Sequence, residues 1–295
     1  MQQNENFKDW LFRYQYIYRI RRTEKNKRRF LSALVTDISE MREDIQVIEY
    51  NRHKKYASRN VYVGDIEKAD QIICTYYDTP LKSIGSYVLF NRKEQGKRTT
   101  KFILGSSILM ILAGIIGTLI FMRYVSEALD LASLRTVFIV LAYGIYFFLL
   151  GKITKGLSSR KTLVRNTSSV LTLLAMISEI KEKRTAFAFI DEGSFGESGL
   201  KALNTSHKKQ ANIFFLDSIG ADAPLHALGN GFSRAKVSEL KIDHLTSDQG
   251  INYIFSARTS EKETKIKTKF YLDKSDLEQK NLNMDNVTRV VELFK

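Results

Sequence analysis

The sequence predicts an α/β domain of three layers, α/β/α, built around a mixed sheet, with a two-helix transmembrane hairpin inserted in it. Short runs of β-branched and aromatic residues alternate with segments whose apolar residues recur at helical spacing. One stretch, residues 102–151, is far more apolar than the rest. We therefore expect N-terminal helices (1–59), one cytoplasmic domain (60–101 and 152–295) and the hairpin (102–151). With two prolines and no internal repeat, nothing indicates a second soluble domain.

The N-terminal segment carries aromatic residues at helical spacing. Residues 6–22 place one apolar face on a helix, made of Phe7, Trp10, Leu11, Tyr14, Ile17 and Tyr18. This pattern predicts an amphipathic helix that packs on the core of the domain, lies in a membrane interface or contacts a partner. A second helix is expected over residues 27–45.

The central apolar stretch contains two candidate membrane spans. Residues 102–122 carry no charge, and at about 1.5 Å per helical residue this length matches a hydrocarbon core of about 30 Å. Residues 136–151 are fewer and would span together with flanking residues 131–134 or by local thinning of the bilayer. The alternative is a hairpin buried in a large soluble core, which rarely contains such a long uncharged run.

Basic residues flank both predicted spans on the same side. The flanking residues are Arg92, Lys93, Lys97, Arg98 and Lys101 before the first span, and Lys152, Lys155, Arg160, Lys161 and Arg165 after the second. Because basic flanks stay in the cytoplasm, we expect a two-span protein of the cell membrane with both termini and the soluble domain cytoplasmic. The net charge of +14 then indicates attraction to membrane lipid. No nucleic-acid partner is expected, since no binding motif accompanies the charge.

The soluble part shows alternating strand and helix patterns. Strands are expected at 60–66, 71–77, 185–190 and 211–216, and an apolar helix at 168–180. Further strands and helices are expected at 236–242, 251–257 and 267–272, and a final helix at 284–295. Asp191 and Asp217 follow two of the buried strands, the position that active-site groups often occupy in open α/β sheets.

Five segments carry polar residues in a recognisable order. They are ADQIICTYYDTP, RNTSSVLTLLAMISEI, TAFAFIDEGSFGESGLKAL, NIFFLDSIG and TSDQG. In this order they resemble the zinc aminopeptidases of metallopeptidase family twenty-eight, whose relatives include glutaminyl cyclase. The resemblance covers about residues 60–295, with the hairpin as an insertion. It implies an aminopeptidase-like domain.

The first two segments depart from the family at metal-binding positions. Tyr76 stands where the resemblance implies a histidine zinc ligand, and Asp78 matches the aspartate that orients that histidine. Arg165 replaces the aspartate that bridges the two zinc ions, whereas Asn166 matches the family asparagine.

The later segments depart in the same way. Gly193 and Ser194 stand at the positions of the adjacent glutamates, one the general base and the other a zinc ligand. Asp217 matches a retained ligand, and Gln249 replaces the last histidine ligand. The resemblance therefore implies that one of five zinc ligands survives and that the catalytic glutamate is absent.

The residue types lead to the same expectation. A two-metal site needs several carboxylate and imidazole donors to hold two dications. Arg165 would bring a permanent positive charge into that space, because a guanidinium is not deprotonated in proteins. We therefore expect no metal, no cofactor and no catalysis, and an ion pair of Arg165 with Asp217 or Asp78.

Three functions are consistent with these expectations. The first is a pseudoenzyme that binds a peptide or protein through the degenerate pocket, as an accessory subunit of a membrane complex such as a peptide exporter. The second is an active aminopeptidase or cyclase with a rebuilt one-metal site of Asp217, Asp191 or Glu192, and His244. The third is a structural anchor whose pocket has no role.

Overall fold

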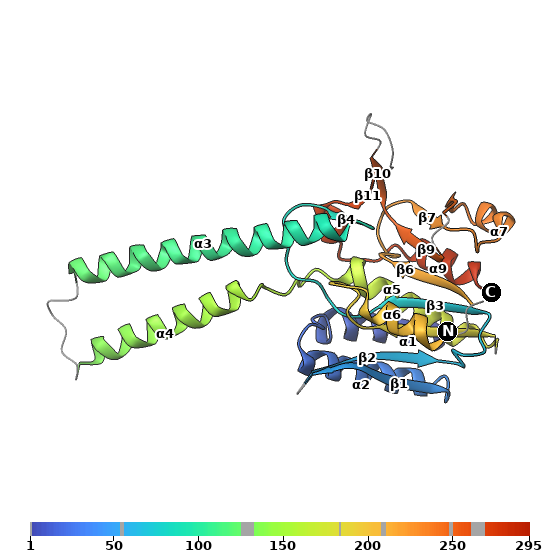
Figure 1. Ribbon diagram of the computed structural model, residues 1–295, viewed down its shortest axis with the longest axis horizontal. Coiled ribbons are helices and arrows are strands. Elements are labelled where there is room, and N and C mark those ends of the chain that lie inside the picture. Colours follow the sequence, from blue (N-terminus) through green and yellow to red (C-terminus); the bar gives the residue numbers. More distant parts are fainter. Residues whose placement is uncertain are drawn as a thin grey trace. The chain divides into compact units, whose positions relative to one another are not determined.

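The computed structural model of the protein describes residues 2–53, 56–124, 133–182, 184–207, 211–247, 250–260 and 269–295 (Figure 1). Its helices are α1 (Gln2–Phe12), α2 (Glu24–Ser39), α3 (Arg92–Tyr124), α4 (Leu134–Thr154), α5 (Ser168–Glu179), α6 (Ser198–Ser206), α7 (Arg234–Glu239), α8 (Lys274–Leu277) and α9 (Met284–Leu293), with π-helical segments η1 (Arg13–Ile17) and η3 (Leu163–Thr167). Its strands are β1 (Ile45–His53), β2 (Tyr56–Val63), β3 (Gln71–Tyr76), β4 (Tyr87–Val88), β5 (Thr185–Ile190), β6 (Asn212–Asp217), β7 (Leu225–Leu228), β8 (Asp243–Leu245), β9 (Ile251–Ser256), β10 (Arg258–Ser260) and β11 (Lys269–Leu272).

One mixed sheet organises the α/β part of the chain. Its strand order is β1-β2-β5-β3-β6-β9-β7-β8. The central strands β5, β3, β6 and β9 run parallel, whereas β2 is antiparallel to β5 and β7 is antiparallel to β9. The mixed sheet predicted from the sequence is confirmed. Because parallel strands end at the same edge of a sheet, the carboxyl ends of β5, β3 and β6 meet there.

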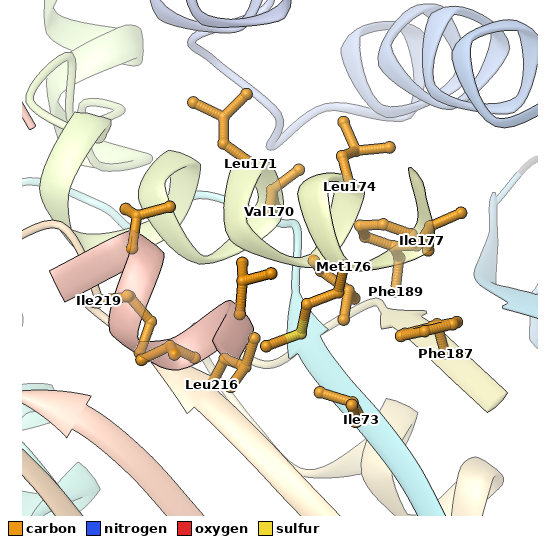
Figure 2. Close-up of a cluster of buried hydrophobic side chains, with 14 of the residues drawn as sticks. Ile73, Val170, Leu171, Leu174, Met176, Ile177, Phe187, Phe189, Leu216 and Ile219 are labelled. Atoms are coloured by element: carbon orange, nitrogen blue, oxygen red, sulfur yellow. The ribbon is translucent and has the colours of Figure 1, made fainter. Parts of the chain in front are cut away.

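Helices cover both faces of this sheet. Side chains alternate along the strands, so Phe187 and Phe189 of β5 face one core while Ala186 and Ala188 face another. The first core is closed by α1, α2, α5 and α9, and Figure 2 shows side chains of α5 above those of β3 and β5. The second core is closed by α6. This arrangement gives the predicted three layers.

The N-terminal helix is shorter than its apolar pattern predicts. Trp10 and Tyr14 are buried in the core of the domain, as one alternative expected, but the helix ends at Ile17 instead of residue 22. Its last turn is π-helical, with the Tyr18 amide donating to the Arg13 carbonyl at 2.9 Å. The wider turn shifts the phase of the apolar face, so Ile17 is 48% exposed. Ile17 therefore does not pack on the core of the domain with Trp10 and Tyr14.

The boundary between the second helix and the first strand also differs from the prediction. Helix α2 begins after Thr23, whose side chain accepts from the Asn26 amide, and it ends at Ser39 instead of residue 45. Ile45 instead begins β1, an edge strand opposite Val63 of β2. The sequence did not predict this strand, because the adjacent apolar residues Val47 and Ile48 break the alternation that indicates a half-buried strand.

A small antiparallel sheet lies in the order β10-β11-β4. It carries a third apolar cluster, in which Leu89, Val164, Phe255 and Phe270 are buried. Its short strand β4 was not predicted. This strand matters for the site because it supplies Tyr87.

The chain divides into two compact units, of which the second holds residues 81–85 and 91–158. Its helices α3 and α4 are both long and apolar enough to cross a membrane, and neither has a buried residue among those described. The two helices contact each other where the Tyr146 hydroxyl donates to the Met110 carbonyl at 3.1 Å. The connecting residues 125–132, which include part of the predicted flank 131–134, lie outside the described residues.

Candidate functional site

Three parallel strands of the sheet end in aspartates. Asp78 follows β3 by two residues, Asp191 follows β5 directly, and Asp217 is the last residue of β6. All three are nearly or fully buried. The residues after two of them, Glu192 and Ser218, have positive φ of 59° and 54°, which is uncommon for residues other than glycine. The chain therefore turns sharply at these strand ends. Asp217 and Asp78 each lie at the centre of a cluster of polar groups.

The first cluster, here called the hydroxyl cluster, surrounds Asp217 and consists of Tyr76, Tyr87, Arg165, Asp217 and Ser218. The Tyr87 hydroxyl donates to Asp217 Oδ2 at 2.7 Å, and the Tyr76 and Ser218 hydroxyls donate to Oδ1 at 3.3 and 2.8 Å. Burial raises the pKa of Asp217, and the bond from Tyr87 and the charge of Arg165 offset part of the increase. Both oxygens of this carboxylate therefore have protein donors.

Arg165 lies in η3 and is 7% exposed. Its guanidinium carbon is 3.9 Å from the centroid of the Tyr87 ring, a cation–π contact, rather than in an ion pair with Asp217 or Asp78 as the sequence had suggested. Burial works against the charge, but Tyr76, Tyr87 and Asp217 favour it, so the pKa of Arg165 is raised. Its Nε is buried without a hydrogen-bond partner among the described residues.

The second cluster, here called the turn cluster, consists of Asp78, Asn166, Gly193 and Ser194. Asp78 Oδ1 accepts from the amide of Gly193 at 2.8 Å, and Oδ2 accepts from the amide of Ser194 at 3.1 Å. The Asp78 carbonyl accepts from Asn166 Nδ2 and from the Ser194 hydroxyl at 2.8 and 2.7 Å. Burial and the nearby Asp191 raise the pKa of Asp78 to about 6, against the opposing effects of Lys27 and the two amides. This aspartate holds the turn after β5.

Gly193 packs directly against Tyr76. A Cβ atom added at residue 193 would lie 2.2 Å from the Cβ of Tyr76 and 2.6 Å from its Cγ. Since real Cβ atoms do not approach so closely, the position that the resemblance assigns to a glutamate has no room for a side chain. The two clusters are therefore in direct contact, through Gly193 of the turn cluster and Tyr76 of the hydroxyl cluster.

The other candidate metal ligands, Asp191, Glu192 and His244, contact residues outside the two clusters. Asp191 Oδ1 forms an ion pair with Lys27 of α2 at 2.5 Å, and Glu192 accepts from the Ser58 hydroxyl. His244 Nε2 lies 2.9 Å from the Gly229 carbonyl. Among the described residues, no group of three or more histidine, cysteine, aspartate and glutamate side chains is arranged to hold a metal ion. The one-metal site of Asp217, Asp191 or Glu192, and His244 is not assembled in this part of the chain.

The donors around Asp217 do not fit the pair of zinc ions that the family resemblance implies. A zinc site needs several anionic or imidazole ligands with free lone pairs. Here the carboxylate of Asp217 accepts from three hydroxyl groups, and a buried guanidinium lies against one of the same tyrosines. A dication would meet the positive charge of Arg165.

The structure brings together most of the residues that the sequence singled out. Tyr76, Arg165 and Asp217 meet in the hydroxyl cluster, and the turn cluster holds Asp78, Asn166, Gly193 and Ser194. Gln249 lies outside the described residues. Sequence reasoning missed Tyr87, Ser218 and Lys27. Ser218 follows Asp217 and could have been noted, but Tyr87 and Lys27 come from distant segments that only the tertiary fold brings to the site.

Comparisons with known proteins extend this description. No family model and no curated protein sequence matches the chain. Among solved structures, a glutaminyl cyclase from Tannerella forsythia is similar at a TM-score of 0.53 and 10% identity, covering 98% of this chain and 96% of that one. A leucine aminopeptidase precursor from Bacteroides thetaiotaomicron is similar at 0.50 and 10%, covering 99% and 96%. At these identities the likeness concerns the fold, and the chain therefore has the α/β/α fold seen in aminopeptidases and glutaminyl cyclases.

Proposed function

We propose that this protein is a non-catalytic, membrane-anchored member of the aminopeptidase-like folds. In this proposal it acts as an accessory subunit that binds a protein or peptide within a membrane complex, such as a peptide exporter. The observation that carries the proposal is the hydroxyl cluster. Where the resemblance implies two zinc ions, the side chains of Tyr76, Tyr87 and Arg165 surround Asp217.

The close contact at Gly193 supports the same conclusion by a separate route. A general base at this position would need a side chain, and its first atom would overlap Tyr76. Tyr76 in place of the family histidine therefore fits only beside a residue without a side chain, such as Gly193. A glutamate at residue 193 would not fit this packing unless Tyr76 also changed. The loss of chemistry involves two residues that contact each other.

Burial of the former pocket bears on how a partner would bind. Tyr76, Asp78, Asn166 and Asp217 are each at most 8% exposed. A peptide that reached Asp217 would have to displace hydrogen-bonded side chains from a buried cluster, which costs free energy. We therefore propose that the accessory role uses the outer surface of the domain instead of the former pocket.

The hairpin supports the membrane part of the proposal. The most apolar stretches of α3 and α4 are 6% and 0% buried among the described residues, so their apolar side chains are exposed there. Apolar surface of this extent is stable in contact with lipid or with other membrane helices. Because basic flanks stay in the cytoplasm, we propose that the α/β unit lies on the cytoplasmic side.

Metal content and turnover test the non-catalytic assignment. The full chain, purified in mild detergent, should contain no stoichiometric zinc. It should neither cleave aminoacyl substrates nor cyclise N-terminal glutamine when zinc or cobalt is added. One tightly bound metal ion per chain, with turnover lost in Asp217→Asn, would contradict the proposal. Asp222→Asn is the matched control, because Asp222 is exposed and is not a residue of the hydroxyl cluster.

Purification of the full chain from native membranes, again in mild detergent, tests the accessory role. A subunit of a membrane complex should elute with a second membrane protein in a fixed ratio, and the ratio should persist through a second purification step. A chain that elutes alone from every mild detergent would argue for a structural anchor without a partner.

A further inference from the structure

The segment between α1 and α2 carries exposed aromatic and aliphatic side chains beside arginines. Phe12 and Tyr16 are each 58% exposed and Ile17 is 48% exposed. Next to them lies a hollow of about 190 Å³, whose lining includes Tyr16, Ile17, Tyr18, Arg19, Asn26 and Arg29. We call Phe12, Tyr16, Ile17, Arg19 and Arg29 the basic-aromatic patch.

Local backbone geometry explains why apolar side chains are exposed there. The π-helical turn η1 keeps Tyr14 in the core, yet it turns Tyr16 and Ile17 toward solvent. Phe12 and Tyr16 contact each other, with ring centroids 5.4 Å apart. A single exposed apolar residue is ordinary, whereas three within six residues leave a continuous apolar surface.

Two arginines at this surface have no carboxylate partner among the described residues, although neighbouring basic residues do. Several cations of the segment have partners of their own, since Arg28 pairs with Glu24 and Lys27 pairs with Asp191. Among the described residues, Arg19 and Arg29 form no ion pair with a carboxylate, and the guanidinium of Arg29 lies 5.8 Å from the ring of Tyr18. The patch therefore presents two arginines next to apolar rings without compensating negative charge.

We propose that the basic-aromatic patch docks on the surface of a bilayer that contains anionic phospholipid. Aromatic rings insert at the boundary between headgroups and acyl chains, and arginines beside them bind the phosphate groups. Attraction to an anionic leaflet favours this occupant over a neutral one. The inference goes beyond the proposed function, because it assigns the α/β unit a lipid contact of its own, and it rests on that function only for membrane insertion of the chain.

A fluorescent label in the patch tests the proposal directly. Ile17→Cys is labelled with an environment-sensitive dye, and the full chain is reconstituted in nanodiscs of phosphatidylcholine with or without phosphatidylglycerol. Cys74 is fully buried and remains unlabelled. We expect blue-shifted emission and quenching by brominated lipid only in the anionic discs. Added salt should reverse both effects, since it screens the arginines.

Two controls separate specific docking from general adsorption. Val47→Cys on β1 is a matched site, because Val47 is 45% exposed and Ile17 is 48% exposed. Its label should not respond to lipid charge. Arg19→Gln and Arg29→Gln should each weaken docking about fivefold, as expected for loss of one charge near an anionic surface. The lysine variants at both positions should keep docking, because they keep the charge.

The outcomes distinguish this inference from the proposed function. If the chain enters the discs but the label at residue 17 behaves alike with and without phosphatidylglycerol, the docking proposal is wrong while membrane insertion stands. An equal response from the label at residue 47 would also overturn it. Failure of the chain to enter any disc would instead contradict the hairpin anchor and with it the premise of docking.

Discussion

Asp78 and Asp217 lie at the carboxyl ends of neighbouring parallel strands, β3 and β6, but their carboxylates accept from different kinds of donor. Asp78, which the family resemblance retains, accepts from backbone amides of the turn after β5. Asp217, also retained in the resemblance, accepts from the hydroxyls of Tyr76, Tyr87 and Ser218. The turn cluster therefore depends on main-chain donors, whereas the hydroxyl cluster depends on the identity of its side chains.

The difference concerns how each buried carboxylate is compensated. A buried carboxylate without partners is costly. Main-chain amides of the turn after β5 compensate Asp78. Three hydroxyls and a nearby guanidinium compensate Asp217.

The largest expected effect concerns pH and Asp78. Its folded-state pKa of about 6 exceeds its ordinary value, so its contribution to stability is fully present at low pH and is lost as pH rises through about 6. A shift of this size corresponds to about 3 kcal/mol. Asp78→Asn should remove this pH dependence from the free energy of unfolding, followed by fluorescence of the single tryptophan, Trp10.

Burial also raises the pKa of Asp217, so the comparison is the difference in the free energy of unfolding between wild type and variant at each pH. The exposed Asp222→Asn should leave the profile of the wild type unchanged. Parallel profiles for the wild type and Asp78→Asn would show that Asp78 has an ordinary pKa.

A smaller effect is expected where the two clusters meet. Gly193→Ala places a Cβ atom 2.2 Å from that of Tyr76, so the strand end must shift, and we expect a loss of about 2 to 3 kcal/mol in the free energy of unfolding. Gly196→Ala is the matched control in the same turn, because a Cβ atom there would lie 3.7 Å from the Glu192 carbonyl oxygen, an ordinary contact. Denaturant unfolding in detergent measures both. Equal stability of the two variants would mean that the turn is not packed against Tyr76.

The smallest effect separates the two tyrosines of the hydroxyl cluster. Tyr87→Phe removes a bond of 2.7 Å to a buried carboxylate and should cost about 1.5 kcal/mol. Tyr76→Phe removes a bond of 3.3 Å and should cost less than about 1 kcal/mol. The same unfolding measurement ranks them. The reverse order would mean that Tyr76 is the main donor to Asp217.

Much of the fold could be predicted from local pattern. The buried runs that became β5 and β6 and the apolar helix α5 were predicted within one or two residues, because continuous burial leaves a strong signal in the sequence. Strands β1 and β4 were missed, since β1 is mostly exposed at an edge and β4 has two residues. The site residues could be named from motif order, but their partners could not.

The sequence by itself determined which elements are apolar and therefore buried or able to enter a membrane. Through its resemblance to zinc aminopeptidases it also predicted that Arg165 and Tyr76 stand at metal-ligand positions. Only the tertiary structure decided what those residues do. Tyr87 comes from β4 and lies far along the chain from Asp217, and its place against Arg165 depends on the packing of a separate small sheet. Local sequence sets hydrophobicity and helical or extended preference, whereas contacts between distant residues follow from how whole layers pack together.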